Sequence, residues 1–540
     1  DFENVDLTPL ITINGNVDTS IGGTYSVRYN VEDLAGNNAI EVIRTVAVGD
    51  LTGPVITLVG GTIELFVGDS YVEPGFTAID FTDGDVSNNV VITNTINNAV
   101  VGVYNVKYNV SDVAGNASEA TRIVKVKNPP QWNEVGSFVG DLVTNDRLAN
   151  SALSSDGNII ATSNWMGSSD KRGRIRVYQR NGSSWTQIGQ DVIGLTGNVP
   201  LVSLSSDGTI FTLPSDSYDT NSVLNVGAVR VFQYNGSSWV QMGQTIKGSN
   251  QNDMIGRSRI SADGSTLVIS SWHNDRSVSV YKYNGSSWIQ HGQTLVESGD
   301  ERYGLITAIN SDGSIIAVSA HFADKNGLNR SGTVYVYQDD GSSWVQIGYW
   351  EGTINQFQLG YNSIGLSSDG TIISMSGRSD PDAKVRVFKY SNGVWNQLGT
   401  DILGPGTSHP SVAGYQNNWF GYNTNLNSDG TIIGISNYYG HNLTGGAPYK
   451  IGHLYIYQYD GASWSQIGQT MVGENQDDMM AYSVSLNSSG TVVSVGAMFY
   501  DSGGVSSVGK VYVYEYDDGS GSIVDTTAPV ITLNGDSSVD

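Results

Sequence analysis

The sequence contains no cysteine. Disulfide bonds, thiolate metal sites, iron–sulfur clusters and thiol catalysis are therefore excluded. Basic residues are also scarce, because 27 lysines and arginines face 52 aspartates and glutamates, which gives a formal net charge of −25. A field of this sign repels nucleic acid phosphates and anionic lipids, so we expect neither as a partner. It is compatible with the binding of cations.

Long apolar runs are absent as well. No stretch is long enough to cross a bilayer, so we expect no direct membrane insertion in this segment. The sequence shows no signal peptide and no initiator methionine. Proline is rare at 12 residues, whereas there are 66 glycines, 29 tyrosines and 11 tryptophans, a composition typical of many short strands. A chain of 540 residues is too long for one core and predicts several domains.

The ends of the chain carry copies of one unit. "GGTYSVRYNVEDLAGNNA" matches "VGVYNVKYNVSDVAGNAS" at a constant offset of 79 residues. The second copy has an additional front half over residues 53–79, and this front half starts again with "APVITLNGDSSVD" at Ala528. We therefore expect a segment of a larger protein, with part of a repeat at 1–49, a complete repeat at 50–128 and the start of another at 528–540.

The repeats alternate in period two, as Tyr104, Val106, Tyr108 and Val110 illustrate. About eighty residues of short strands with Gly and Asn turns predict a β-sandwich. The "PVITL…G…Y…DVAGN" skeleton resembles the immunoglobulin-like repeats of large bacterial surface proteins. This resemblance implies an extracellular location at the cell surface.

The middle of the chain repeats a four-stranded unit at a spacing of about fifty residues, which is typical of a β-propeller. Its marker is a tryptophan that usually begins a "WxQxG" strand, at Trp132, Trp185, Trp239, Trp288, Trp344, Trp395 and Trp464. The first such strand, Trp132–Gly136, has no partner before it, and the last set ends at Lys510–Tyr516 without one. We predict that the first strand completes the last blade.

The whole chain is thus predicted to be all-β, with immunoglobulin-like β-sandwich repeats and a seven-bladed β-propeller closed by its N-terminal strand. The propeller is expected over residues 131–517, followed by a linker at 518–527. The recurring "NGSSW" is interpreted as the turn between the third and fourth strands of a blade, because Asn–Gly adopts positive φ at little cost.

The stretches "GYNSIGLSSDGTIISMSG" and "AYSVSLNSSGTVVSVGA" resemble seven-bladed propellers of the FG-GAP, integrin-α-like type, in the form found in surface proteins of Bacteroidota. The resemblance implies an adhesin for cell adhesion, from a gliding or marine bacterium that exports it by type IX secretion. The alternating aspartates of integrin calcium loops are absent, so it implies no metal site in the propeller.

No catalytic motif stands out. "GVSSVGK" at Gly504–Lys510 has the P-loop spacing, but Val511 follows it and it opens a strand instead of a helix. None of the six histidines forms H-E-x-x-H, and no G-x-S-x-G occurs. From these features we expect the chain not to be an enzyme.

One set of acidic residues is a candidate metal site. Asp80, Asp83, Asp85 and Asp112 are hard oxygen donors near turn glycines of the complete repeat, and they make calcium the candidate cofactor. The spacing is not that of an EF-hand, since Val91 stands where the closing glutamate would be. The alternative interpretation is that these aspartates cap turns by accepting backbone N–H bonds.

The propeller has short, uniform turns on one face and long, irregular loops on the other. The long loops carry aromatic residues, which we predict to bind a ligand: Trp165, Trp272, Trp350, Trp419, Phe420, Tyr438, Tyr439 and Tyr500. The alternative is that several of these rings plug the entrance or pack between blades.

Three functions are compatible with these features. The first is an extracellular adhesin-type segment with stalk repeats, whose propeller binds a surface glycan or a protein. The second is a structural component of a surface filament or layer, in which the repeats contact neighbouring repeats of the same long chain. The third is a carbohydrate-active enzyme that uses the propeller funnel.

Overall fold

The computed structural model describes residues 6–141, 143–165, 172–195, 201–220, 223–271, 273, 276–297, 302–377, 384–404, 419–440 and 450–519. The chain forms two compact units, of which the second is Pro130–Asp518 and the first holds the described residues up to Pro129. The predicted repeat at 528–540 and most of the linker at 518–527 lie outside the described residues. Within these ranges, no helix has the length and apolarity of a membrane span.

The first repeat contributes one antiparallel sheet in the order β1-β2-β3, preceded by a short 3-10 helix. Its elements are η1 (Thr8–Leu10), β1 (Thr12–Asn14), β2 (Gly23–Asn30) and β3 (Val42–Val48). Most of its side chains are exposed, as expected for part of a sandwich.

The second repeat is a sandwich of two sheets, in the orders β4-β6-β7 and β5-β10-β9-β8. Val106, Tyr108 and Val124 alternate inward and are fully buried between them. The elements are β4 (Val55–Leu58), β5 (Ile63–Phe66), β6 (Phe76–Asp80), β7 (Gly84–Asp85), η2 (Ser87–Asn89), β8 (Val91–Asn94), β9 (Gly102–Ser111) and β10 (Ala117–Lys127).

The second unit is a propeller, in which the described residues form seven antiparallel sheets of at least four strands. Each is named here as a blade, numbered in chain order and written from its innermost strand outward. Blade 1 is β12 (Leu148–Leu153), β13 (Ile159–Asn164), β14 (Arg174–Asn181) and β15 (Ser184–Gln187), with β16 (Val192–Ile193). Blade 2 is β17 (Ser203–Leu204), β18 (Ile210–Ser215), β19 (Ala228–Tyr234) and β20 (Trp239–Gln241), with β21 (Ile246–Lys247). Blade 3 is β22 (Ile255–Ile260), β23 (Thr266–Ser271), β24 (Ser277–Tyr283) and β25 (Trp288–Val296).

The remaining blades continue the pattern. Blade 4 is β26 (Tyr303–Ile309), β27 (Ile315–Ala320), β28 (Thr333–Asp339) and β29 (Trp344–Glu351). Blade 5 is β30 (Leu359–Leu366), β31 (Ile372–Gly377), β32 (Lys384–Ser391) and β33 (Val394–Gln397), with β34 (Ile402–Leu403). Blade 6 is β35 (Phe420–Leu426), β36 (Ile432–Asn437), β37 (His453–Tyr459) and β38 (Trp464–Gln466), with β39 (Met471–Val472). Blade 7 is β40 (Met480–Leu486), β41 (Val492–Ala497), β42 (Lys510–Asp517) and β11 (Gln131–Val139).

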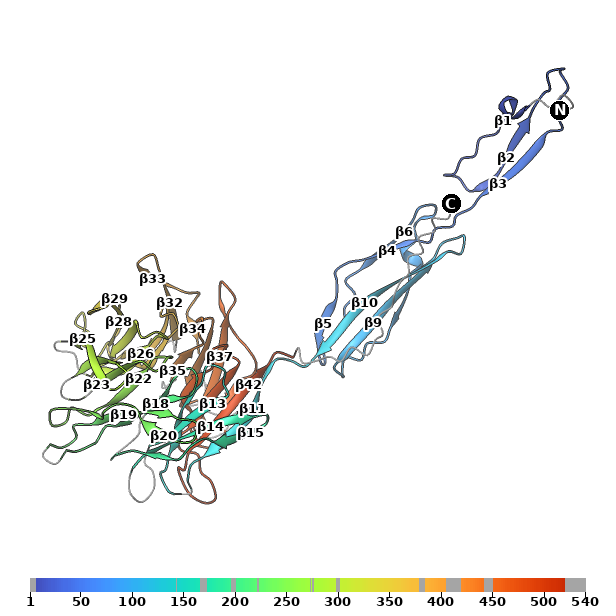
Figure 1. Cartoon of the computed structure of the whole chain (residues 1–540). Helices are drawn as coiled ribbons and strands as arrows, with labels where there is room; N and C mark the ends of the chain where they lie inside the picture. The colour runs from blue at the N-terminus through green and yellow to red at the C-terminus, as the bar shows by residue number, and fades with distance from the viewer. Residues whose placement is uncertain are drawn as a thin grey trace. The chain divides into compact units, whose positions relative to one another are not determined.

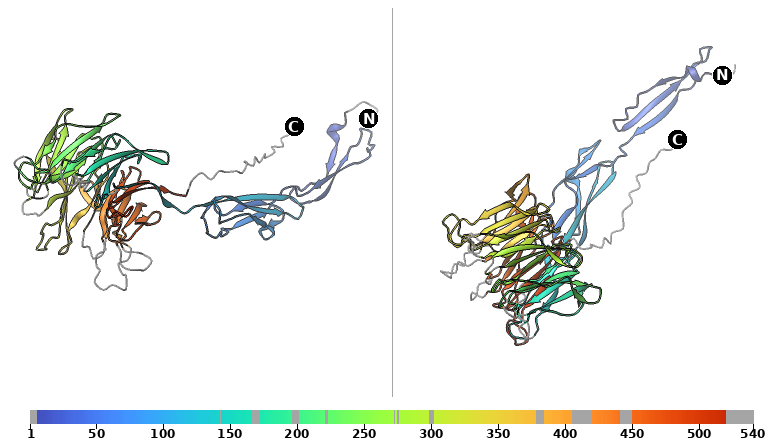
Figure 2. Two further views of the ribbon diagram at one scale, coloured as in Figure 1. Left: turned by 90° about the horizontal axis from the view of Figure 1, so that it is seen from below. Right: turned by 60° about the vertical axis from the view of Figure 1, so that its left-hand side comes forward.

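The order of blade 7 confirms the predicted closure, because its outermost strand comes from the start of the unit. β11 pairs antiparallel with β42, from Gln131 opposite Asp517 to Val139 opposite Lys510. Figure 1 shows β11 beside β42, and Figure 2 shows the same unit from two further sides. The all-β fold, with immunoglobulin-like repeats and a closed seven-bladed propeller, is as the sequence predicts.

The "WxQxGQ" motif holds neighbouring blades together. The indole Nε1–H of each marker tryptophan donates to a main-chain carbonyl of the preceding blade, at 2.9–3.3 Å. A side chain on the motif glycine would bring its first carbon within 2.9 Å of the next indole, so glycine is required there. The final glutamine spans the junction too, since the Gln469 amide accepts from Trp132 N–H at 2.8 Å and donates to its carbonyl at 2.7 Å.

The turns after the innermost strands form a second link between blades. The N–H of one turn residue in each blade donates to the carbonyl of its counterpart in the next, at 2.7–3.0 Å. The chain of donors returns to its start, in the order Ser155, Ser206, Ala262, Ser311, Ser368, Ser428, Ser488 and again Ser155. This circle of main-chain hydrogen bonds surrounds the axis on the face that carries the short turns.

We expect Trp132→Ala to destabilise the propeller by about 3 to 5 kcal/mol, the usual cost of removing a buried aromatic side chain. Trp132 is 2% exposed and its indole joins blade 7 to blade 6. Chemical unfolding monitored by tryptophan fluorescence and circular dichroism would measure the change. The matched control is Asn133→Ala, at the next, exposed position of β11, which should stay within about 0.5 kcal/mol of the wild type. Equal stability of the two variants would contradict a role for the closing strand.

Candidate functional site: a central channel and a carboxylate cluster

A cavity of about 510 Å³ lies at the centre of the propeller. Its lining includes residues of the innermost strand of all seven blades, β12, β17, β22, β26, β30, β35 and β40. The innermost strands begin at the face of the long loops and end just before the circle of turn residues. The volume is in the range that binds small ligands or a few sugar rings. We name this cavity the channel.

Aromatic rings gather where the innermost strands begin. Tyr361, Tyr422 and Tyr482 lie near the starts of β30, β35 and β40 and line the channel together with Trp165. Tyr422 stacks on Tyr438 of the same blade at 4.8 Å between centroids. Contacts across blades join Tyr482 to Tyr438 at 5.5 Å and to Trp165 at 6.2 Å. This aromatic cluster forms the mouth of the channel on the long-loop face.

Burial has a chemical consequence for these tyrosines. It raises the pKa of Tyr482 to about 12, and it raises the pKa of Tyr422 as well. Both side chains therefore stay neutral at physiological pH. A neutral phenol can donate a hydrogen bond to a ligand oxygen, which a phenolate cannot.

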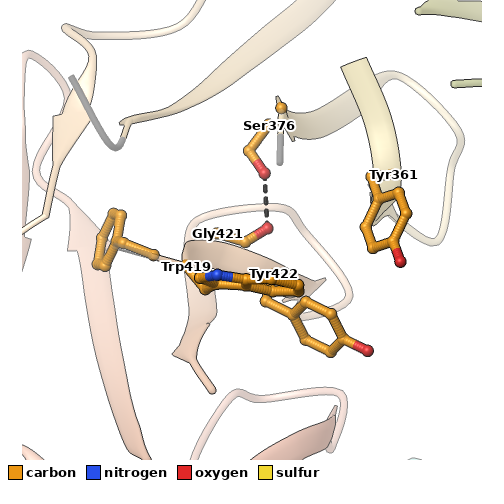
Figure 3. A pocket seen from close by; sticks show the side chains of 7 residues that line it. Tyr361, Ser376, Trp419, Gly421 and Tyr422 are labelled. Atoms are coloured by element: carbon orange, nitrogen blue, oxygen red, sulfur yellow. Dashed lines mark hydrogen bonds between the residues drawn. The ribbon is translucent and has the colours of Figure 1, made fainter. Parts of the chain in front are cut away.

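A small cavity of about 10 Å³ adjoins the mouth, with room for one water molecule. Figure 3 shows its lining, with Tyr361 on a different strand from Trp419 and Tyr422. The Ser376 hydroxyl donates to the Gly421 carbonyl across this cavity at 2.6 Å. The indole of Trp419 lies 5.5 Å from the ring of Tyr422, so the small cavity and the mouth share one aromatic wall.

The predicted ligand-binding residues fall into two groups. Trp165, Trp419, Tyr438 and Tyr439 belong to the aromatic cluster, with Trp419 only 4.4 Å from Tyr439. Tyr438 is 7% exposed, so it supports the other rings more than it offers a surface.

Of the other predicted residues, the three that the structure describes do not line the channel. Phe420 is 2% exposed and packs against Tyr455, because it is the first residue of β35 and not part of a loop. Trp350 belongs to β29 and packs between blades against Phe388 and Trp395. Tyr500 is half-buried beside the Lys510 ammonium at 5.0 Å, and Trp272 lies outside the described residues.

The sequence prediction missed the cations of the channel. Arg257 and Arg259 of β22 and Arg302 before β26 all line it. The signal was available in the repeats, because Arg259 stands directly before the last residue of the innermost strand. The other six blades place small or neutral residues at this position: Ala152, Ser203, Ala308, Gly365, Asn425 and Ser485.

The second candidate site is a carboxylate cluster in the complete repeat. Asp50, Asp80, Asp83 and Asp112 each offer an oxygen, and these oxygens lie within 4.8 Å of one another. Three of these residues are predicted from the sequence. Asp85 is not part of the cluster, because its carboxylate accepts from the Ser87 N–H in the following turn. Asp50, which sequence reasoning missed, lies between β3 and β4, and the Asn116 amide holds its carbonyl at 3.1 Å.

Turn capping accounts for only part of this cluster. Asp80 Oδ1 accepts from the N–H groups of Thr82 and Asp83 at 2.8 and 2.9 Å, as the alternative interpretation requires. The second oxygens of Asp80 and Asp50 are buried and have no hydrogen-bond partner within the part of the chain that the structure describes, and Asp80 is only 2% exposed. A buried carboxylate oxygen without a partner is costly, so it points to a ligand that the turn does not supply.

The comparison with known proteins gives the class of the first unit. Residues 1–48 and 56–126 match the model of the bacterial surface protein, Ig-like domain. A phage protein of 81.3 kDa from Acholeplasma phage L2 is 31% identical over 152 residues, which are 26% of this chain and 20% of that protein. The chain thus spans about a fifth of that relative's length. The match to the family model supports a surface protein with immunoglobulin-like repeats, to which the fold adds a propeller.

Solved structures resemble the propeller at low identity. A putative 6-phosphogluconolactonase from Bacteroides uniformis is 13% identical with a TM-score of 0.43, and the match covers 71% of this chain and 96% of that one. The periplasmic gluconolactonase of Pseudomonas aeruginosa is 16% identical with a TM-score of 0.42, covering 71% and 97%. The C-terminal WD40 domain of Sif2 is 11% identical with a TM-score of 0.42, covering 72% and 99%.

These neighbours correct one prediction. The expectation that the chain is not an enzyme, which rested on the absence of catalytic motifs, is contradicted, because two of the similar structures are named as gluconolactonases, one of them as putative. At such identities the likeness concerns the fold alone, so it assigns no reaction to this chain.

Proposed function

We propose that the chain is an adhesin-type segment of an extracellular surface protein, in which the repeats form a stalk and the propeller binds a glycan or a protein. The observation that carries this proposal is the aromatic mouth of the channel. Its rings come from blades 1, 5, 6 and 7, so a rigid ring of strands holds a wide aromatic surface at one end of a cavity of about 510 Å³. Aromatic faces pack against the C–H faces of sugar rings and against apolar protein side chains.

The test uses the full chain on an array of glycans and on surface proteins of candidate host cells. Trp419→Ala should weaken the strongest binding by at least about 30-fold, which corresponds to ~2 kcal/mol for an aromatic residue at the centre of a site. The control is Tyr349→Ala on β29, where the ring is 39% exposed and remote from the channel lining. Unchanged binding by Trp419→Ala, with both variants folded by thermal unfolding, would contradict the proposed site.

Calcium binding by the carboxylate cluster is the second part of the proposal. Calcium takes oxygen ligands at 2.3–2.6 Å, so oxygens on opposite sides of the ion are at most about 4.6 to 5.2 Å apart. One carboxylate oxygen from each aspartate of the cluster lies within 4.8 Å of the others. Asp50 and Asp80 each also have a buried oxygen without a hydrogen-bond partner among the described residues. Four carboxylates and no imidazole or thiolate favour a hard cation over zinc.

We expect calcium to raise the melting temperature of the first unit in the full chain, measured by differential scanning calorimetry. Saturation at a hundred times the dissociation constant would add about 2.7 kcal/mol to its stability. Asp80→Asn should abolish the response, and it should stabilise the calcium-free form because it removes a buried charge. Asp85→Asn is the matched control outside the cluster and should respond as the wild type does. A full calcium response in Asp80→Asn would contradict the site.

One observation favours the second candidate function, a filament or layer. Leu51, Phe81 and Val113 each follow an aspartate of the cluster, and their side chains are 87, 87 and 89% exposed. Such apolar side chains around one end of a repeat suit contact with a neighbouring repeat. If the chain self-associates in sedimentation velocity, Phe81→Ser should weaken the association, whereas Trp419→Ala should not. Association that is indifferent to Phe81→Ser would count against this candidate.

A further inference from the structure

The channel carries positive charge that its own protein does not neutralise. Arg257 and Arg259 alternate with buried Ser258 along β22, so both side chains project to the same side, into the channel. Arg302 adds a third guanidinium, which lies over the ring of Phe322 at 4.4 Å. Among the described residues that line the channel there is no aspartate or glutamate.

Other arginines of the propeller have carboxylate partners. Arg176 pairs with Asp141 at 2.9 Å and with Asp191 at 3.0 Å, and Arg180 pairs with Glu515 at 2.8 Å. Within the described residues, Arg257 and Arg259 form no ion pair, and the hydrogen bond recorded for Arg259 is to the Ser258 carbonyl at 3.2 Å. In a chain with nearly twice as many acids as bases, two unpaired arginines side by side call for an explanation.

Architecture does not supply this explanation. The six other blades build the same strand with Ala, Ser, Gly or Asn where β22 has Arg259. Burial, together with the charge of Arg257, lowers the pKa of Arg259 to about 10, so the group is destabilised by its surroundings and yet stays charged at pH 7. A guanidinium held in this way without a counter-ion costs stability. Strain of this kind is typical of a site whose ligand provides the missing charge.

The surroundings narrow the chemistry of that ligand. A guanidinium presents a planar fork of N–H donors that matches two oxygens of a carboxylate or a sulfate. The same channel is lined by the phenols of Tyr361, Tyr422 and Tyr482, which lie on the innermost strands β30, β35 and β40. The indole of Trp165 lies at its mouth. An anion attached to a ring would therefore contact the guanidinium donors inside the channel, while its ring would contact the aromatic side chains nearer the mouth.

We propose that the channel binds an acidic saccharide, with a carboxylate or sulfate group at Arg257 and Arg259 and its sugar rings against Trp165 and the channel tyrosines. This inference rests on the proposed binding function and specifies its ligand class. The ligand enters from the long-loop face, where the aromatic cluster forms the mouth of the channel. The net negative charge of the chain repels anions in general. The channel therefore favours those anions that also carry a sugar ring for its aromatic side chains to contact.

The test is isothermal titration of the full chain with hexuronic acid oligosaccharides, sulfated oligosaccharides, neutral oligosaccharides of the same length, and sodium sulfate alone. We expect an acidic oligosaccharide to bind at least tenfold more tightly than its neutral counterpart. Binding should weaken as salt rises from about 0.1 M to about 1 M, which shortens the screening length from about 10 Å to about 3 Å.

Arg259→Ser is the central variant, since it installs the residue that blades 2 and 7 carry at this position. We expect it to weaken binding of the acidic oligosaccharide by about 10- to 100-fold, the usual effect of a lost hydrogen bond to a charged group. It should leave the melting temperature of the unliganded propeller unchanged or higher, because a half-buried charge without an ion-pair partner among the described residues is removed. Lys389→Ser removes a charge from an exposed position of β32 and should change neither quantity.

Four outcomes would overturn the inference. Two concern the ligand: equal affinity for acidic and neutral oligosaccharides, and sulfate alone binding as tightly as the saccharide. Two concern Arg259→Ser: unchanged binding, and a fall in melting temperature large enough to explain its loss of binding by loss of folded protein. A ligand that depends on Trp419 and not on Arg259 would sustain the proposed function and reject the acidic saccharide. If both Trp419→Ala and Arg259→Ser bind as the wild type does, the proposed function and the acidic saccharide are both rejected.

Discussion

The contact that the propeller depends on is the hydrogen bond from the indole of one blade to a main-chain carbonyl of the blade before it. This bond fixes the spacing of neighbouring sheets, and it recurs at every junction, including the one that β11 completes. Because the same contact recurs between successive blades, the sheets close into a ring and the turns after their innermost strands hydrogen-bond in sequence. The channel is the space that this ring leaves at its centre.

A scaffold built from repeats makes its departures from the repeat informative. The glycines, glutamines and tryptophans of the motif hold neighbouring blades together, and they recur for that reason. The two arginines of β22 and the tyrosines of β30, β35 and β40 have no such task, and they face one cavity. Within the first unit, two separate turns of the complete repeat provide Asp80, Asp83 and Asp112, while the connecting segment between the repeats adds Asp50.

The architecture could be predicted from the sequence because the spacing of the marker tryptophans and their position within each repeat can both be read directly. The array has one strand without a partner at each end, and these two strands, β11 and β42, pair with each other in the structure. The sites were harder to predict. Asp50 lies thirty residues before Asp80, and only folding brings the two together. Trp350 and Phe420 resemble loop residues because they adjoin irregular segments. The strands nevertheless extend far enough to bury Phe420 and to half-bury Trp350. Arg259 could have been found by aligning the blades with one another, but its lack of a counter-ion is visible only in three dimensions.

The pairing of β11 with β42 also decides how the propeller meets mechanical force. Gln131 and Asp517 are cross-strand partners, so tension on the two flanking segments enters and leaves the ring at one point. The antiparallel pair is then pulled from its open end, where hydrogen-bonded pairs separate one after another, and the six other blades bear no tension. The indole of Trp132, one residue inside that end and buried against blade 6, is the first obstacle to such peeling.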